Sequence, residues 1–283
     1  MTRRIGVLSV ILAGIISPGW LRTQPRAAAP LSFDVASIKP APRNSAGGER
    51  LRFLPGGRFV AENTPLCMLI TAAYNLPPQS PRLSGGLNWI RFERFDVEAK
   101  ADQAAAPPGQ ARKLRDTELR LMLQSLLAER FKLKLLRETK EMPVYVLVVQ
   151  RGGPKLQSSK IKTEEDCVED GAAGVACHSL TGGQGRGLHG EAVEISDIAR
   201  FVENWTDRPV LDKTGLQGLF RVDTEGWTPL IPRQSGSDQG EDLSDPTRPT
   251  LYSLFAKLGL RLESQRAPVD VFTIEDVQSP AGN

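Results

Sequence analysis

Apolar residues recur every three or four positions in four segments of the chain, which is the spacing of an amphipathic helix. These segments are residues 66–74, 116–131, 196–205 and 251–258. Thr64 and Ser196 are candidate N-caps for the first and third helices, with Pro65 suited to the first helical position. Gly259 follows the fourth segment, where glycine commonly ends a helix. The pattern therefore predicts a helix in each segment.

Apolar and polar residues alternate between these segments, as they do in half-buried strands. The expected strands are residues 33–38, 51–53, 58–60, 95–99, 133–135, 143–149, 219–223, 260–262 and 268–272. Pro55, Gly56 and Gly57 separate the second strand from the third and predict a hairpin. A charged stretch at 138–141 is interpreted as a turn between two strands, and a similar charged stretch precedes Pro268.

The order helix, strand, helix, strand, strand occurs twice along the chain. Pro143 and Pro268 lie 125 residues apart, and Gly86 and Gly215 lie 129 apart. A repeat of this length indicates duplicated domains, because solenoid repeats are about 20–50 residues long. We therefore expect an α+β fold of two related helix-strand-helix-strand-strand units, each a small mixed sheet covered by helices, with an N-terminal strand and hairpin before the first.

The domain boundaries follow from the weakly patterned segments. The first unit is expected at residues 30–157 and the second at 191–283, joined by a loop at 158–190. Residues 101–110 are rich in alanine, proline and glycine, and residues 231–249 are rich in serine, glycine, aspartate and proline. Both segments are typical of surface loops.

Residues 1–29 have the pattern of a signal peptide. Arg3 and Arg4 precede an uncharged apolar run from Ile5 to Ile16, and small residues follow at 27–29. The apolar run is much shorter than the roughly 20 residues that span a bilayer, so we expect a cleaved segment rather than a membrane anchor. The mature protein is expected to be exported, either periplasmic or secreted, and not membrane-spanning.

Removal of the signal segment changes the charge balance. The full chain has 36 basic and 33 acidic residues, and the segment holds four arginines and no acid, which leaves 32 basic against 33 acidic residues. Nucleic-acid binding therefore loses its electrostatic basis. No nucleic-acid partner is expected.

The three cysteines are interpreted through this location. Cys167 and Cys177 are close enough in sequence to close a short loop, and disulfides persist outside the cytoplasm. We therefore expect a disulfide between them. Cys67 lies on an apolar helix face, where a free cysteine behaves as a small hydrophobic residue.

Two motifs suggest cofactors, but their contexts disfavour both. Residues 185–190 read G-x-G-x-x-G, yet a glycine-rich loop precedes them and no helix follows directly, as a dinucleotide site requires. Cys167, Cys177, His178 and His189 offer four possible zinc ligands, but their spacing matches no paired zinc motif. We therefore expect neither a cofactor nor a metal.

Candidate ligand contacts are aromatic and acidic residues near the ends of predicted elements. Trp89, Trp205 and Trp227 could stack on a ligand, although core packing is the commoner role of tryptophan. Carboxylates alternate along two predicted strands, at Asp96 and Glu98 and at Asp223 and Glu225, so each pair shares one face and could act as acid and base on a glycan. Solvated strand faces show the same alternation. The three tryptophans, Asp96 and Asp223 form a candidate ligand or partner surface, and no residue is assigned as catalytic.

The mature chain resembles a family of uncharacterised exported proteins that is abundant in soil acidobacteria. The resembling segments are residues 33–40, 55–59, 126–133, 143–147, 212–218, 258–262 and 279–283. The resemblance implies a domain of unknown function, sometimes fused to BlaR-type membrane zinc peptidases, and hence an extracytoplasmic sensing or binding role. The family offers no established catalytic residue to transfer.

These observations favour an exported, non-enzymatic binding or interaction protein. Its partner would be a small ligand or an envelope protein held between the two halves, where internal symmetry creates a cleft. One alternative is a structural component of an envelope complex that pairs through exposed sheet edges. A second is a secreted hydrolase that uses strand carboxylates.

Overall fold

The computed structural model describes residues 31–42, 47–102, 112–167, 177–228 and 249–280. The predicted signal segment lies outside these ranges. Four α-helices and three four-stranded sheets make up an α+β fold in the described residues. None of these helices is both long enough and apolar enough to cross a bilayer.

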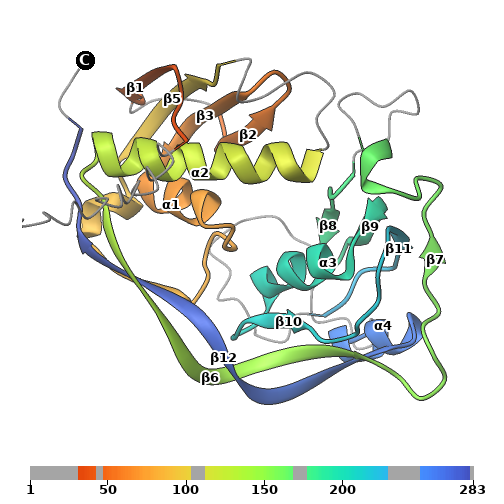
Figure 1. The fold of residues 1–283 in the computed structure, drawn as a ribbon. Helices are drawn as coiled ribbons and strands as arrows, with labels where there is room; N and C mark the ends of the chain where they lie inside the picture. Colours follow the sequence, from red (N-terminus) through yellow and green to blue (C-terminus); the bar gives the residue numbers. More distant parts are fainter. Residues whose placement is uncertain (1–30, 43–46, 103–111, 168–176, 229–248, 281–283) are drawn as a thin grey trace, which may run out of the picture.

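Two long strands run through the whole molecule. β6 (Lys134–Val149) and β12 (Leu260–Asp276) pair antiparallel along almost their full lengths (Figure 1). Each was expected as two strands separated by a charged turn, and that expectation is wrong. The charged residues at 138–141 are exposed members of a continuous strand, and Glu141 and Glu138 sit opposite Pro268 and Val271.

The N-terminal lobe is built on a sheet of strand order β1-β5-β3-β2. Its strands are β1 (Val35–Pro40), β2 (Arg50–Leu54), β3 (Arg58–Pro65) and β5 (Arg94–Lys100). Helices α1 (Leu66–Ala73) and α2 (Arg112–Arg130) belong to this lobe (Figure 1), as does the short 3-10 helix Asn88–Arg91. The hairpin predicted around Pro55 is present as the β2–β3 pair.

The C-terminal lobe contains a sheet of order β7-β11-β9-β8. Its strands are β7 (Gln157–Ser158), β8 (Thr181–Gly183), β9 (Gly187–Val193) and β11 (Phe220–Asp223). Helices α3 (Ile195–Val202) and α4 (Leu251–Lys257) complete it, with 3-10 helices at Glu164–Asp166 and Glu203–Trp205. The segment 158–190 was expected to be a loop, but it contains β8 and contributes to β7 and β9.

The third sheet connects the two lobes. Its order is β10-β6-β12-β4, where β4 (Leu83–Gly85) runs parallel to β12 and β10 (Val210–Asp212) runs parallel to β6. The hydrophobic core of the N-terminal lobe includes Ile274 from β12, and the partly buried Leu135 from β6 packs against it. The core of the C-terminal lobe includes Leu147 and Leu262 from the other ends of the same strands. Each core is therefore completed by both halves of the chain.

Two predicted helix caps differ from those observed. α1 begins one residue later than expected, with Pro65 rather than Thr64 at the N-cap. The hydroxyl of Thr64 instead donates to the carbonyls of Arg50 and Glu62, in β2 and β3. The N-cap of α3 is Glu194 rather than Ser196, and a reciprocal capping box joins Glu194 to Asp197. This capping box places two carboxylates at the boundary between the lobes.

Candidate functional site

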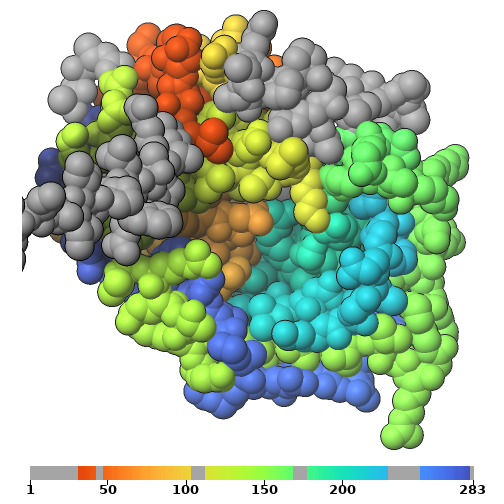
Figure 2. All heavy atoms as spheres, in the orientation of Figure 1, coloured from red at the N-terminus to blue at the C-terminus, as the bar shows by residue number. Residues whose placement is uncertain are grey.

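A cleft of about 860 Å³ lies between the two lobes. β2 and α2 line it from the N-terminal lobe, and α3 and β10 line it from the opposite side. Figure 2 shows the yellow start of α2 against the teal and green surface of the C-terminal lobe. The location agrees with the cleft expected between the halves, and its lining is strongly charged.

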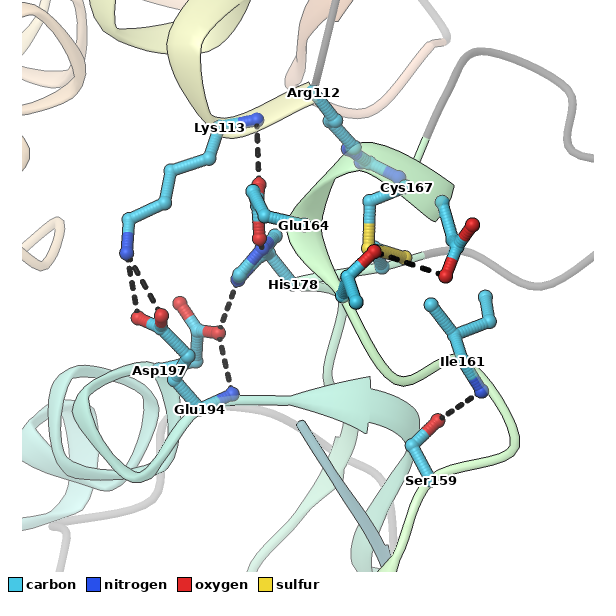
Figure 3. Close-up of a disulfide and its surroundings, with 12 residues drawn as sticks. Arg112, Lys113, Ser159, Ile161, Glu164, Cys167, His178, Glu194 and Asp197 are labelled. Carbon is cyan, nitrogen blue, oxygen red and sulfur yellow. Dashed lines mark hydrogen bonds and ion pairs between the residues drawn. A yellow bond between two sulfur atoms is a disulfide. The ribbon is translucent and has the colours of Figure 1, made fainter. Parts of the chain in front are cut away.

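His178 lines this cleft and lies between two carboxylates. Its Nδ1 is 2.7 Å from Asp197 Oδ2, and its Nε2 is 2.8 Å from Glu164 Oε2 (Figure 3). Its backbone has a φ of 53°, in the left-handed region that costs most residues about 1 kcal/mol. Because carboxylates engage both ring nitrogens, the charged imidazolium satisfies this arrangement best.

The pKa values in this cluster follow from burial and pairing. Burial disfavours charge on His178, but its hydrogen bonds and attraction to Asp197 and Glu164 outweigh burial and raise its pKa. Burial alone would raise the pKa of Asp197, but His178, the Glu194 N–H and Arg200 together lower it. Both shifts favour the ion pair between His178 and Asp197.

Lys113 connects the same cluster to the N-terminal lobe. Its Nζ lies 2.8 Å from both carboxylate oxygens of Glu194, and its backbone N–H donates to Glu164 Oε1 at 3.3 Å (Figure 3). These contacts satisfy the first turn of α2 with groups from the other lobe. We call Lys113, Glu164, His178, Glu194 and Asp197 the interlobe clamp.

The predicted disulfide joins Cys167 to Cys177 beside the clamp. Both cysteines are buried, and they pack with Ala192 and Leu219. The carbonyl of Cys167 accepts the backbone N–H of Arg112 at 3.0 Å, at the start of α2. The disulfide therefore holds the backbone near Glu164 next to the backbone of His178, and both residues belong to the clamp. Cys67 is a half-buried free cysteine.

The clamp carries the donor atoms of a possible metal site. Ligand atoms of His178, Glu194 and Asp197 lie within 4.8 Å of one another. Lys113 already neutralises Glu194, and His178 is bonded through both nitrogens. The sequence offered four possible zinc ligands, Cys167, Cys177, His178 and His189. They cannot form that zinc site here, because the sulfurs of Cys167 and Cys177 are bonded to each other.

A second polar connection between the lobes surrounds Glu203. The Glu203 side chain is 2% exposed and lies 3.3 Å from Nη2 of Arg82. It also accepts hydrogen bonds from the Ser80 hydroxyl and the Val210 backbone N–H. A carboxylate this deeply buried is stable only with such a full set of partners.

Arg120 on α2 is a largely buried cation in the cleft lining. Its guanidinium stacks 4.6 Å from the ring centroid of Phe53 and donates to the carbonyl of Ala72. No carboxylate in the described ranges lies within ion-pair distance of it. Burial, followed by repulsion from Arg200, lowers its pKa to about 10, so it stays cationic at neutral pH.

The five residues expected to form a ligand surface do not come together. Trp89 and Asp96 belong to the N-terminal lobe, whereas Trp205, Trp227 and Asp223 belong to the other. Trp227 is fully buried and packs edge-on against the half-buried Trp205. None of the five lines the interlobe cleft.

The other residues singled out in the sequence analysis make local structural contacts. Residues 185–190 hold the end of the turn between β8 and β9 and the first four residues of β9, and Gly183 pairs with Gly187 in this antiparallel hairpin. His189 is exposed and lies 2.8 Å from Asp223. Asp96 accepts the Asn63 backbone N–H at 2.8 Å, in a different sheet from Asp223.

The chain belongs to the family described as "Protein of unknown function (DUF3738)", whose sequence profile matches residues 67–277. That range begins after β1, β2 and β3 of the N-terminal lobe, and it contains the interlobe clamp and five of the six arginines that line the cleft, including Arg82, Arg120 and Arg200. Searches of the curated proteins and of the solved structures found no match.

Proposed function

We propose that this member of the DUF3738 family is an exported, non-enzymatic binding protein whose ligand or partner occupies the interlobe cleft. The observation that carries the proposal is the cleft itself, which is about 860 Å³ in volume and charged on both sides. Ligand sites are preferentially found in such concave spaces between structural units. The resemblance to exported acidobacterial proteins and the signal-like segment 1–29 support an extracytoplasmic location.

The two lobes are, in this proposal, descendants of one duplicated unit. In the third sheet Leu83 is the partner of Phe272, and Asp212 is the partner of Leu147. An offset of 129 residues relates Leu83 to Asp212, and an offset of 125 relates Leu147 to Phe272. These are the offsets at which the sequence motifs repeat. The long β6–β12 pair also centres on Met142 and Ala267, which are 125 residues apart.

The state of His178 favours binding over catalysis. A histidine that acts as a general base needs a free nitrogen within reach of a substrate proton. Both nitrogens of His178 are held by carboxylates, and His189 lies outside the cleft lining. The hydrolase alternative needs two available carboxylates in one pocket. The strand carboxylates considered for it, at positions 96, 98, 223 and 225, do not line the cleft, and each of the five carboxylates that do is engaged by a basic side chain or a hydrogen-bond donor.

A blocked cleft tests this function. Thr117 lines the cleft from α2, and Leu121 is an exposed residue on the same helix outside that lining. The mature protein and the variants Thr117→Trp and Leu121→Trp are used to capture partners from the native envelope, with identification by mass spectrometry. The same proteins are screened against small molecules by thermal shift.

Binding that is lost in Thr117→Trp and kept in Leu121→Trp is the expected result. Equal binding by both variants would place the site outside the cleft and refute the proposal. Turnover of a captured molecule by the wild-type protein would refute its non-enzymatic part.

A further inference from the structure

Building on the proposed function, we propose that the cleft binds an oxyanion, a carboxylate or phosphate group, held between Arg120 of α2 and Arg200 of α3. The two arginines belong to different lobes and both line the main cleft. They also both line a neighbouring pocket of about 300 Å³. An anion between them would therefore contact both lobes at once.

The cleft lining holds more basic than acidic side chains, and the acidic side chains already have partners. Seven lysine and arginine side chains face five acidic side chains in the lining. Glu203 is engaged by Arg82, and Glu194 by Lys113. Asp212 accepts the backbone N–H and hydroxyl of Thr214. These contacts leave little negative charge for the arginine pair.

The other two acidic side chains of the lining, Asp116 and Asp197, also have partners. Asp116 lies 3.0 Å from Nη2 of Arg115 on the same helix. Asp197 divides its charge, because its Oδ2 contacts His178 and its Oδ1 accepts from Nη2 of Arg200 at 3.2 Å. Arg200 therefore has only part of one carboxylate. Arg120 has no carboxylate within ion-pair distance in the described ranges.

The position of Arg120 fits a binding role. Phe53 lies under one face of the guanidinium, which holds the group in a fixed plane. A fixed guanidinium presents paired N–H donors that match the oxygens of a carboxylate or phosphate. On the other side, Arg200 donates to Asn75 Oδ1, a contact that crosses between the lobes. Two positioned cations without a full counter-charge make a site suited to an anion.

The anion class is tested by calorimetric titration of the mature protein with inorganic phosphate and, separately, with succinate and citrate. These arms distinguish a phosphate from a carboxylate ligand. The titrations use wild type, Arg120→Gln, Arg200→Gln and the control Arg151→Gln. Arg151 is exposed and lies outside the cleft lining, so the control removes the same charge elsewhere.

We expect at least one anion to bind wild type and Arg151→Gln equally. Either cleft substitution should weaken that binding roughly 10- to 100-fold, the value of a lost charged hydrogen bond. Circular dichroism and unfolding midpoints identify any variant that misfolds. Arg200, with a side chain 34% exposed, is the safer substitution.

Two results would overturn the anion site. The first is unchanged affinity in both folded cleft variants. The second is the absence of binding to all three anions at 50 mM salt, where screening is weak. A neutral or cationic ligand that Thr117→Trp excludes would refute the anion class and leave the proposed binding function standing. A protein that binds nothing in its cleft would refute both.

Discussion

Removal of the disulfide should destabilise the protein by an amount that the loop length sets. Cys167 and Cys177 are 10 residues apart in sequence. In the chain-entropy description, closing a loop of that length lowers the entropy of the unfolded chain by about 9 cal/mol/K, or about 2.7 kcal/mol at 25 °C. The double variant Cys167→Ala/Cys177→Ala should lose about that much free energy of unfolding.

Urea denaturation followed by tryptophan fluorescence measures this loss, because Trp227 is fully buried in the C-terminal lobe. Cys67→Ala is the matched control, since it removes a half-buried cysteine that forms no disulfide. A loss below about 1 kcal/mol in the double variant would refute the loop-entropy reasoning. A loss well above about 4 kcal/mol would show that the disulfide also holds the clamp residues in place.

Three further predictions concern burial, charge and export. Arg82→Ala leaves the buried Glu203 carboxylate without its cation and should cost about 3 kcal/mol in urea denaturation; a cost below about 1 kcal/mol would contradict it. The pKa of His178 is raised in the folded protein above its ordinary value of 6.5. The charged histidine therefore stabilises the folded state fully at pH values below 6.5, and this stabilisation is lost as the pH rises through the pKa of the folded protein. His178→Asn should therefore destabilise the protein more at pH 6 than at pH 9, and equal losses would contradict this. Expression of the full chain in a bacterial host, with mass spectrometry of the exported product, should place its first residue near 27–30; an intact Met1 would refute cleavage.

The helices and most strands were predictable because their periodicity reflects burial. α2 buries Leu119, Met122, Leu123, Leu126 and Leu127 on the face that the spacing indicated. The long strands were divided wrongly for a physical reason. The middle of β6 lies between the two cores, where both faces are exposed and charged residues are tolerated. A 16-residue strand extends about 50 Å, which is longer than the core of either lobe needs.

The candidate site was harder to predict from the sequence. Arg120 and Arg200 are 80 positions apart, and nothing in their local patterns distinguishes them from solvent-exposed arginines. The disulfide was the one useful signal, because Cys177 immediately precedes His178 and Cys167 closely follows Glu164. The pairing of Cys167 with Cys177 implied that neighbouring side chains would be close. Only the packing of α2 against the C-terminal lobe completed the set.

Asp197 joins the clamp to the proposed anion site. One of its oxygens faces His178 and the other faces Arg200, so the two cations share one counter-charge. When His178 loses its proton, the full charge of Asp197 becomes available to Arg200, and Arg200 attracts an anion less. Linkage is reciprocal, so a bound anion must in turn raise the pKa of His178. Proton and anion are therefore expected to bind cooperatively at the proposed site.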